Sequence, residues 1–92
     1  MAILYSEGGM LINGIEPDNG TDFTLEEMYE WVNTDIVEFV TLNDGQMMII
    51  DEEGKLKGRK INEHATRLYF ERYGMRDFIC GDALVCDESQ VR

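Results

Sequence analysis

The sequence is poor in the residues that define several specialised protein classes, since its 92 residues include two cysteines, one proline and one histidine. Cys80 and Cys86 are too few for a disulfide scaffold, and their spacing matches no zinc motif. No apolar run approaches the ~20 residues that cross a bilayer, and the N-terminus has no signal-peptide pattern. We therefore expect a cytoplasmic protein without metal or other cofactor and without membrane contact, whose cysteines are free thiols.

Positive charge is also scarce, because 8 Lys and Arg stand against 19 Asp and Glu, a formal net charge of −11. Residues 1–54 contain thirteen acidic residues and no Lys or Arg, whereas residues 55–92 contain six acidic and eight basic residues. Direct nucleic-acid binding is not expected, since it depends on neutralising phosphates with Lys and Arg. The acidic half indicates either a surface for a basic partner protein or a solvated surface that keeps the chain soluble.

Hydrophobic periodicity and turn residues predict a single α+β domain over residues 1–92. A capping box of Thr24 and Glu27 predicts the start of one helix, and Asn62 is the expected N-cap of another. The order ββαββαβ predicts a mainly antiparallel sheet with both helices packed on one face. The last residues, Glu88–Arg92, are expected to form a frayed tail. The expected strands cover residues 2–5, 10–15, 35–42, 46–50 and 77–86, and the expected helices cover 24–33 and 62–73.

The first helix carries the candidate contacts to a partner protein. Leu25, Met28, Tyr29 and Val32 recur at helical spacing and form an inner face. Three glutamates are then expected to face water, namely Glu26, Glu27 and Glu30. We predict that these side chains bind a partner with a basic surface, such as the groove of a nucleic-acid-binding protein.

A short basic stretch suggests an alternative function. Lys55, Lys57, Arg59 and Lys60 precede the N-cap Asn62, where the dipole of the second helix favours negative charge. This segment predicts a site for a small anion such as a nucleotide. The same side chains are also placed to neutralise the neighbouring acidic residues 51–53. This alternative is favoured because no glycine-rich phosphate-binding motif accompanies the lysines.

Catalytic residues are not indicated by the sequence. His64 is the only histidine, and it falls in the first turn of the second helix with no nucleophile or orienting group at a recognisable spacing. Carboxylate pairs are too abundant to single out an acid and a base. We therefore expect a monomeric or homodimeric protein that is not an enzyme.

Several stretches resemble a family of small proteins of unknown function carried by phages, plasmids and conjugative elements of bacteria. The most specific is the acidic turn Glu52-Glu53-Gly54-Lys55-Leu56-Lys57-Gly58, followed by the Asn-x-x-Ala-Thr pattern that starts at Asn62. The resemblance implies a mobile-element accessory protein in a bacterial host cell, with counter-defence as an analogy, and it implies no reaction or cofactor. The other matching stretches are Thr24–Glu27, Ile36–Val40 and Ile79–Val85.

Overall fold

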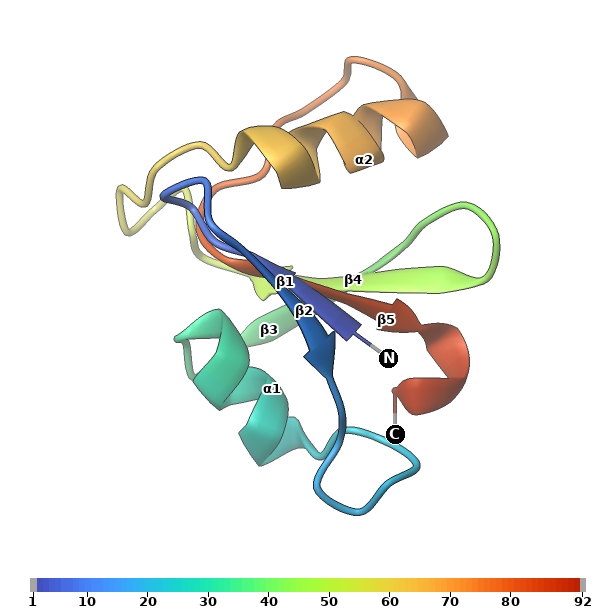
Figure 1. Ribbon diagram of the computed structural model, residues 1–92. Helices are drawn as coiled ribbons and strands as arrows, with labels where there is room; N and C mark the ends of the chain where they lie inside the picture. The colour runs from blue at the N-terminus through green and yellow to red at the C-terminus, as the bar shows by residue number, and fades with distance from the viewer. Residues whose placement is uncertain (1, 92) are drawn as a thin grey trace.

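The computed structural model describes residues 2–91 and shows one sheet between two helices (Figure 1). The order ββαββαβ is confirmed. Most boundaries agree with the expected ranges to within two residues. The elements are β1 (Ala2–Tyr5), β2 (Leu11–Ile15), α1 (Leu25–Val32), β3 (Val37–Thr41), β4 (Gln46–Asp51), α2 (Glu63–Tyr73), β5 (Ala83–Asp87) and the 3-10 helix η1 (Glu88–Gln90).

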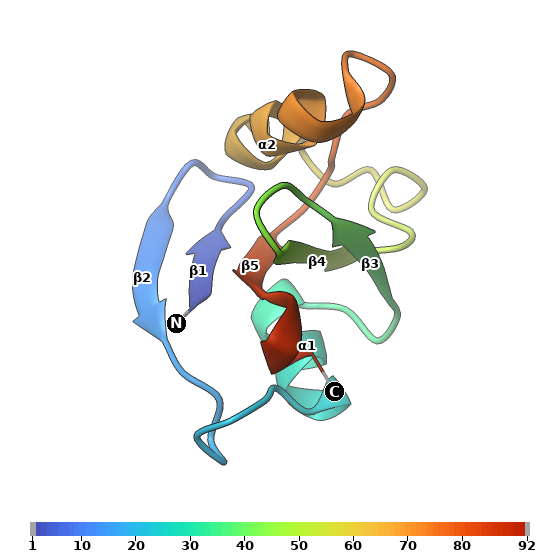
Figure 2. The same ribbon diagram turned by 90° about the vertical axis from the view of Figure 1, so that its right-hand side faces the viewer.

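All neighbouring strands of the sheet are antiparallel, and their spatial order is β2-β1-β5-β4-β3. The strand that comes last in the sequence, β5, therefore lies in the centre, and β2 and β3 form the two edges (Figure 2). The turn residues Asn43-Asp44-Gly45 predict a hairpin, and they do connect β3 to β4, with Asp44 and Gly45 both at positive φ. These observations confirm the antiparallel α+β fold.

The two helices lie on opposite faces of the sheet, so the prediction that both pack on one face is wrong (Figure 1). Met28 of α1 belongs to a buried cluster that includes Ile49 of β4. Ala65 of α2 belongs to a second cluster that includes Met48 and Ile50, the two neighbours of Ile49. Because successive side chains of a strand point to opposite faces, β4 is buried on both sides.

The strand β5 begins six residues later than the expected range of 77–86, which is therefore wrong for its first half. Ile79 is held by the start of α2 instead, since its N–H donates to Thr66 Oγ1 at 2.9 Å and its carbonyl accepts from the Asn62 N–H at 2.7 Å. Gly81 then turns the chain into β5 with a φ of +97°. Ile79 thus packs with Ala65 of α2 in the second cluster, and the residues before Gly81 do not belong to β5.

The segment after β5 is folded. Glu88–Gln90 form η1, and the Phe23 N–H donates to the Gln90 carbonyl at 2.8 Å. Val91 forms an isolated parallel bridge with Phe23 and packs against the same cluster as α1. The prediction of a frayed tail is therefore wrong for residues 88–91, and Arg92 lies outside the described residues. Over residues 2–91, no helix has the length and apolar character needed to cross a membrane.

Candidate functional site

The first turn of α1 uses one of the three candidate glutamates to hold the helix start. Glu27 Oε1 accepts from the Thr24 N–H at 2.9 Å, and the Glu27 N–H donates to Thr24 Oγ1 at 3.2 Å, which confirms the predicted capping box. Glu27 Oε2 also accepts from the Asp18 N–H at 3.0 Å. The Glu27 carboxylate therefore stabilises the start of α1 and the preceding loop, whereas Glu26 and Glu30 are exposed.

This difference predicts opposite effects of two neighbouring substitutions on stability. Glu27→Ala removes acceptors for two backbone N–H groups and is expected to lower the free energy of unfolding by about 1–2 kcal/mol. The matched control, Glu26→Ala, removes an exposed side chain and is expected to change it by less than about 0.5 kcal/mol. Urea unfolding followed by circular dichroism measures both values. Equal losses would show that the cap contributes little.

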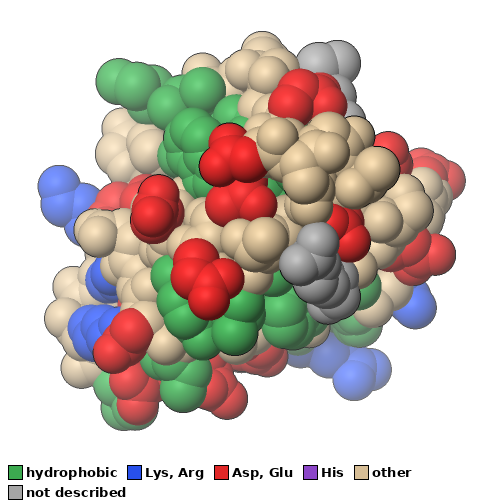
Figure 3. Space-filling model, turned by 90° about the horizontal axis from the view of Figure 1, so that it is seen from below, with side chains coloured by type: hydrophobic (Ala, Val, Ile, Leu, Met, Phe, Trp, Pro, Cys, Tyr) green, Lys and Arg blue, Asp and Glu red, His purple; other side chains and the backbone are tan. Residues whose placement is uncertain are grey.

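The opposite placement of the helices turns the uneven charge of the sequence into a difference between two faces. The segment that contains α1, Glu16–Asp35, has seven acidic residues and no Lys or Arg. On the other side, α2 itself has two acidic and two basic side chains. Viewed from the α1 side, acidic side chains are scattered across the face and the visible Lys and Arg lie at its margin (Figure 3). We call the surface formed by residues 16–35, which include α1, the acidic α1 face.

The basic stretch is joined to carboxylates of the chain itself. Lys57 Nζ lies 3.0 Å and Arg59 Nε 2.8 Å from Oδ2 of Asp51, whose side chain is fully buried. Lys57 also donates to Thr34 Oγ1 at 3.0 Å, and Arg59 donates to the carbonyl of Asn33. We call Asp51, Lys57, Arg59 and Thr34 the Asp51 cluster. It links the end of α1 to the chain after β4.

The Asp51 cluster explains the charge state of its central residue. Burial acts to raise the pKa of Asp51, but hydrogen bonds from the Glu53 N–H and from Lys57, with the positive charge of Lys57, outweigh it. The pKa of Asp51 is therefore held below its usual value. The ionised carboxylate is the form that fits this site.

Asn62 is buried and its amide is used within the fold. Its Oδ1 accepts from the Ala65 N–H at 3.0 Å, which confirms the predicted N-cap, and its Nδ2 donates to the carbonyls of Tyr5 and Gly81 at 2.8 Å each. Lys60 is exposed. The five residues of the proposed anion site therefore do not converge on one ligand position.

Glycine is required in the acidic turn by a close backbone approach. A Cβ on Gly54 would lie 2.4 Å from the carbonyl oxygen of Cys80, much closer than side chains approach backbone atoms. The turn thus packs directly against the segment that precedes β5. This contact explains the glycine in the Glu-Glu-Gly-Lys part of the turn, and it helps to form the wall of a pocket.

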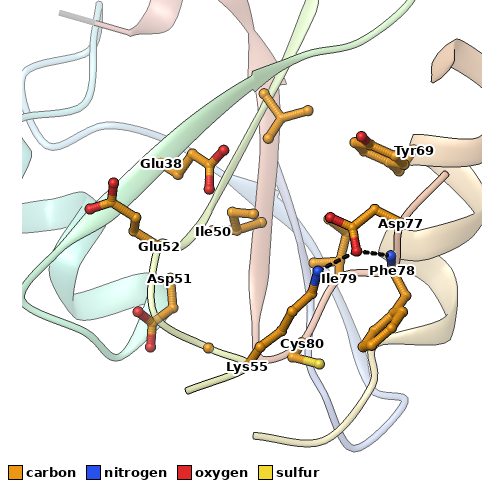
Figure 4. Close-up of a pocket in the computed structure, with 12 residues that line it drawn as sticks. Glu38, Ile50, Asp51, Glu52, Lys55, Tyr69, Asp77, Phe78, Ile79 and Cys80 are labelled. Carbon is orange, nitrogen blue, oxygen red and sulfur yellow. Dashed lines mark hydrogen bonds and ion pairs between the residues drawn. The ribbon is translucent and has the colours of Figure 1, made fainter. Parts of the chain in front are cut away.

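That pocket, of about 130 Å³, lies beside the edge strand β3 on the α2 side of the sheet (Figure 4). Glu38 and Glu52 lie on one side of it, and Asp77 lies on the other with Lys55 (Figure 4). Lys55 Nζ pairs with the Asp77 carboxylate and lies 4.6 Å from the centre of the Phe78 ring. The pocket is lined by Glu38, Val40, Ile50, Asp51, Glu52, Gly54, Lys55, Tyr69, Asp77, Phe78, Ile79 and Cys80.

The sequence did not indicate this pocket, because its lining comes from four separate segments. Hydrogen bonding to Lys55 lowers the pKa of Asp77, so this ion pair is the stable form of that wall. Burial raises the pKa of the Cys80 thiol, which favours its neutral form. Burial also raises the pKa of Cys86, to about 11, and both cysteines are buried free thiols as predicted.

Residues suited to metal binding do not assemble in the part of the chain that the structure describes. Over residues 2–91, no group of three or more His, Cys, Asp and Glu side chains is placed to hold a metal ion. His64 is exposed, and its ring centre lies 5.7 Å from that of Tyr5. The structural features that bear on function include the acidic α1 face, the edge strand β3 and the pocket beside it.

The fold defines a small α+β protein in which an antiparallel five-stranded sheet separates an acidic helix from a mixed-charge helix. The chain belongs to the family described as Domain of unknown function (DUF3846), whose model matches residues 1–91. A search of the curated proteins and of the solved structures found no match.

Proposed function

We propose that this protein is a non-enzymatic interaction module that binds a basic surface of another protein through the acidic α1 face. The observation that carries this proposal is the segregation of charge: α1 and its flanking loops bring acidic residues, and no Lys or Arg, to one side of the sheet. Such a surface attracts a basic partner and accelerates its association. Glu26 and Glu30 are the exposed contacts on α1.

The biological setting of this proposal follows the resemblance of the sequence to proteins of mobile elements. We propose an accessory protein of a phage or plasmid that acts in the cytoplasm of a bacterial host, as a monomer or homodimer. A partner with a basic nucleic-acid groove fits the chemistry, and counter-defence fits by analogy. A chain of charge −11 would occupy such a groove by replacing phosphates, not by binding nucleic acid itself.

The geometry supports protein binding better than the binding of a nucleotide. Lys55, Lys57 and Arg59 are paired with carboxylates, so an anion would have to displace Asp77 or Asp51 from them. The pocket of about 130 Å³ is also well below the about 300–1,000 Å³ of typical small-molecule sites. We therefore advance the acidic α1 face as the functional surface.

The test is capture of a basic partner from an extract of the organism that carries the gene. The variant Glu26→Gln/Glu30→Gln is expected to weaken capture several-fold and to increase its resistance to added salt, because two attractive charges are lost. Glu63→Gln/Glu71→Gln on α2 makes the same change in net charge on the opposite face and is expected to leave capture intact. Equal weakening by both variants would show that capture depends only on net charge and would contradict the assignment of the acidic α1 face.

A further inference from the structure

The edge of the sheet at β3 offers backbone groups to another strand. The Leu42 N–H donates to the Gln46 carbonyl and the Glu52 N–H to the Ile36 carbonyl, so the even-numbered residues of this segment bond to β4. In an antiparallel pair the alternate residues then point their N–H and C=O groups away from the partner. These are Val37, Phe39 and Thr41. The Thr41 carbonyl already accepts from the Tyr73 hydroxyl at 2.7 Å, and within residues 2–91 no strand lies beyond Val37 and Phe39.

The opposite edge, β2, is less suitable for strand addition. The pairing of β1 with β2 shifts register, so that two residues separate Ile12 from Ile15 where one separates Ala2 from Leu4. Such a bulge twists an edge strand and interrupts its row of backbone groups. By contrast, β3 pairs with β4 without a shift from Val37 to Thr41. The regular edge is therefore β3.

The pocket lies directly beside this regular edge and has the lining for one basic side chain. Val40, Ile50 and Ile79 supply apolar surface, and Glu38 supplies a carboxylate on the side nearest β3, where Glu52 also belongs to the lining (Figure 4). Long cationic side chains bury their aliphatic stem on apolar surface and keep the charged end among polar groups. An added strand would place a side chain opposite Glu38, where opposite charges attract across strands.

The size of the pocket limits what enters it. A volume of about 130 Å³ is below the about 300–1,000 Å³ of typical small-molecule sites and suits a single inserted side chain better than a separate ligand. The protein already shows the same chemistry on the far wall, where the Lys55 ammonium lies against Asp77 and the Phe78 ring. The lining therefore suits an ammonium group on an aliphatic stem.

We propose that β3 and the adjoining pocket bind an extended, basic segment of the partner by strand addition, with one lysine side chain in the pocket. Main-chain hydrogen bonds to Val37 and Phe39 supply affinity, and the pocket supplies specificity, as in other strand-addition complexes. This inference rests on the proposed function, because it specifies the part of the basic partner that is recognised.

The direct test is a titration of the full, isotope-labelled chain with an acetylated and amidated pentapeptide that has a central Lys flanked by Thr and Val. Amide resonances of residues 37–40 and of the pocket lining are expected to shift. The same peptide with Gln in place of Lys is expected to bind about tenfold more weakly. A peptide N-methylated on its hydrogen-bonding side is expected to lose binding. Equal binding of all three peptides would overturn the proposal.

One protein variant isolates the backbone contribution. Phe39→Pro removes the outward N–H while leaving the bonds between β3 and β4, since Pro is tolerated on edge strands whose N–H faces solvent. It is expected to weaken the Lys peptide about fivefold or more. The matched control, Phe39→Thr, also loses the ring but keeps the N–H, and is expected to retain binding. Should Phe39→Pro fail to fold, the N-methylated peptide decides the same question.

A second pair of variants isolates the pocket charge. Glu38→Gln/Glu52→Gln is expected to weaken the Lys peptide about tenfold and to abolish its preference over the Gln peptide. Glu63→Gln/Glu71→Gln makes the same change in net charge outside the pocket and is expected to keep the preference. Loss of preference in both variants would mean that the peptide senses only net charge, which overturns the pocket assignment.

The two proposals fail in different ways. If capture of the partner depends on Glu26 and Glu30 but is unchanged by Phe39→Pro and by Glu38→Gln/Glu52→Gln, the acidic α1 face stands and strand addition is wrong. If capture is unaffected by the α1 variant, the proposed function is wrong, whatever the peptide titration shows. The peptide experiment needs no knowledge of the natural partner.

Discussion

Replacing Asp51 by Asn is expected to lower the free energy of unfolding by about 3 kcal/mol, because it removes the buried carboxylate charge that lies 3.0 Å from Lys57 and 2.8 Å from Arg59. The substitution leaves Arg59 paired with the more distant Glu7 Oε1 at 3.8 Å. Arg59 is mostly buried at this position, with 15% of its side chain exposed, so water cannot replace the lost carboxylate fully. Lys57 is 35% exposed and contributes less. The neighbouring exposed substitution Glu52→Gln is the control and is expected to change stability by less than about 0.5 kcal/mol.

The same residue predicts a dependence of stability on pH. The pKa of Asp51 is lowered in the folded protein, so its contribution is fully present above the ordinary value of 3.8 and is lost as the pH falls through the lower, folded value. Urea unfolding between pH 5 and pH 2.5 is expected to show a steeper loss in the natural chain than in Asp51→Asn. Parallel curves would show that Asp51 is not the carboxylate that couples folding to pH.

Local sequence signals predicted the elements that depend on neighbouring residues. The Thr24–Glu27 capping box, the Asn62 cap and the Asp44-Gly45 turn each act within a few residues, and all three are present. The five strands and two helices followed from their apolar patterns. These features need no information about distant parts of the chain.

The placement of the helices on opposite faces of the sheet is indicated by the apolar pattern of the two central strands. Met47–Ile50 and Ala83–Cys86 are almost continuous apolar runs. A strand with one solvated face alternates apolar and polar residues, so continuous runs indicate strands buried on both faces. With β4 and β5 read in this way, one helix on each face is the expected arrangement. The charge asymmetry then becomes an asymmetry between faces.

The long-range contacts of the site were harder to predict because they join residues that are distant in the sequence. The alternative that the basic stretch neutralises the neighbouring acidic residues is confirmed for Asp51, which pairs with Lys57 and Arg59. No local pattern indicates that the same two side chains also reach Thr34 and Asn33 at the end of α1. The pocket likewise brings Glu38 together with Asp77, which no spacing relates. The one available hint was the local charge balance of the basic stretch, which the neighbouring acidic residues offset.

Asn62 shows how one side chain joins such distant segments, and Asn62→Ala is expected to destabilise the protein by about 3 kcal/mol. Of this, about 1 kcal/mol comes from the helix cap to Ala65 and about 1 kcal/mol from each bond to the carbonyls of Tyr5 and Gly81. Asn62→Ser retains a capping oxygen without the amide donor and is expected to recover only about 1 kcal/mol. Urea unfolding separates the two variants. Full recovery by Asn62→Ser would mean that the cap alone matters, whereas the expected partial recovery shows that Asn62 also holds β1 and the chain before β5 to the start of α2.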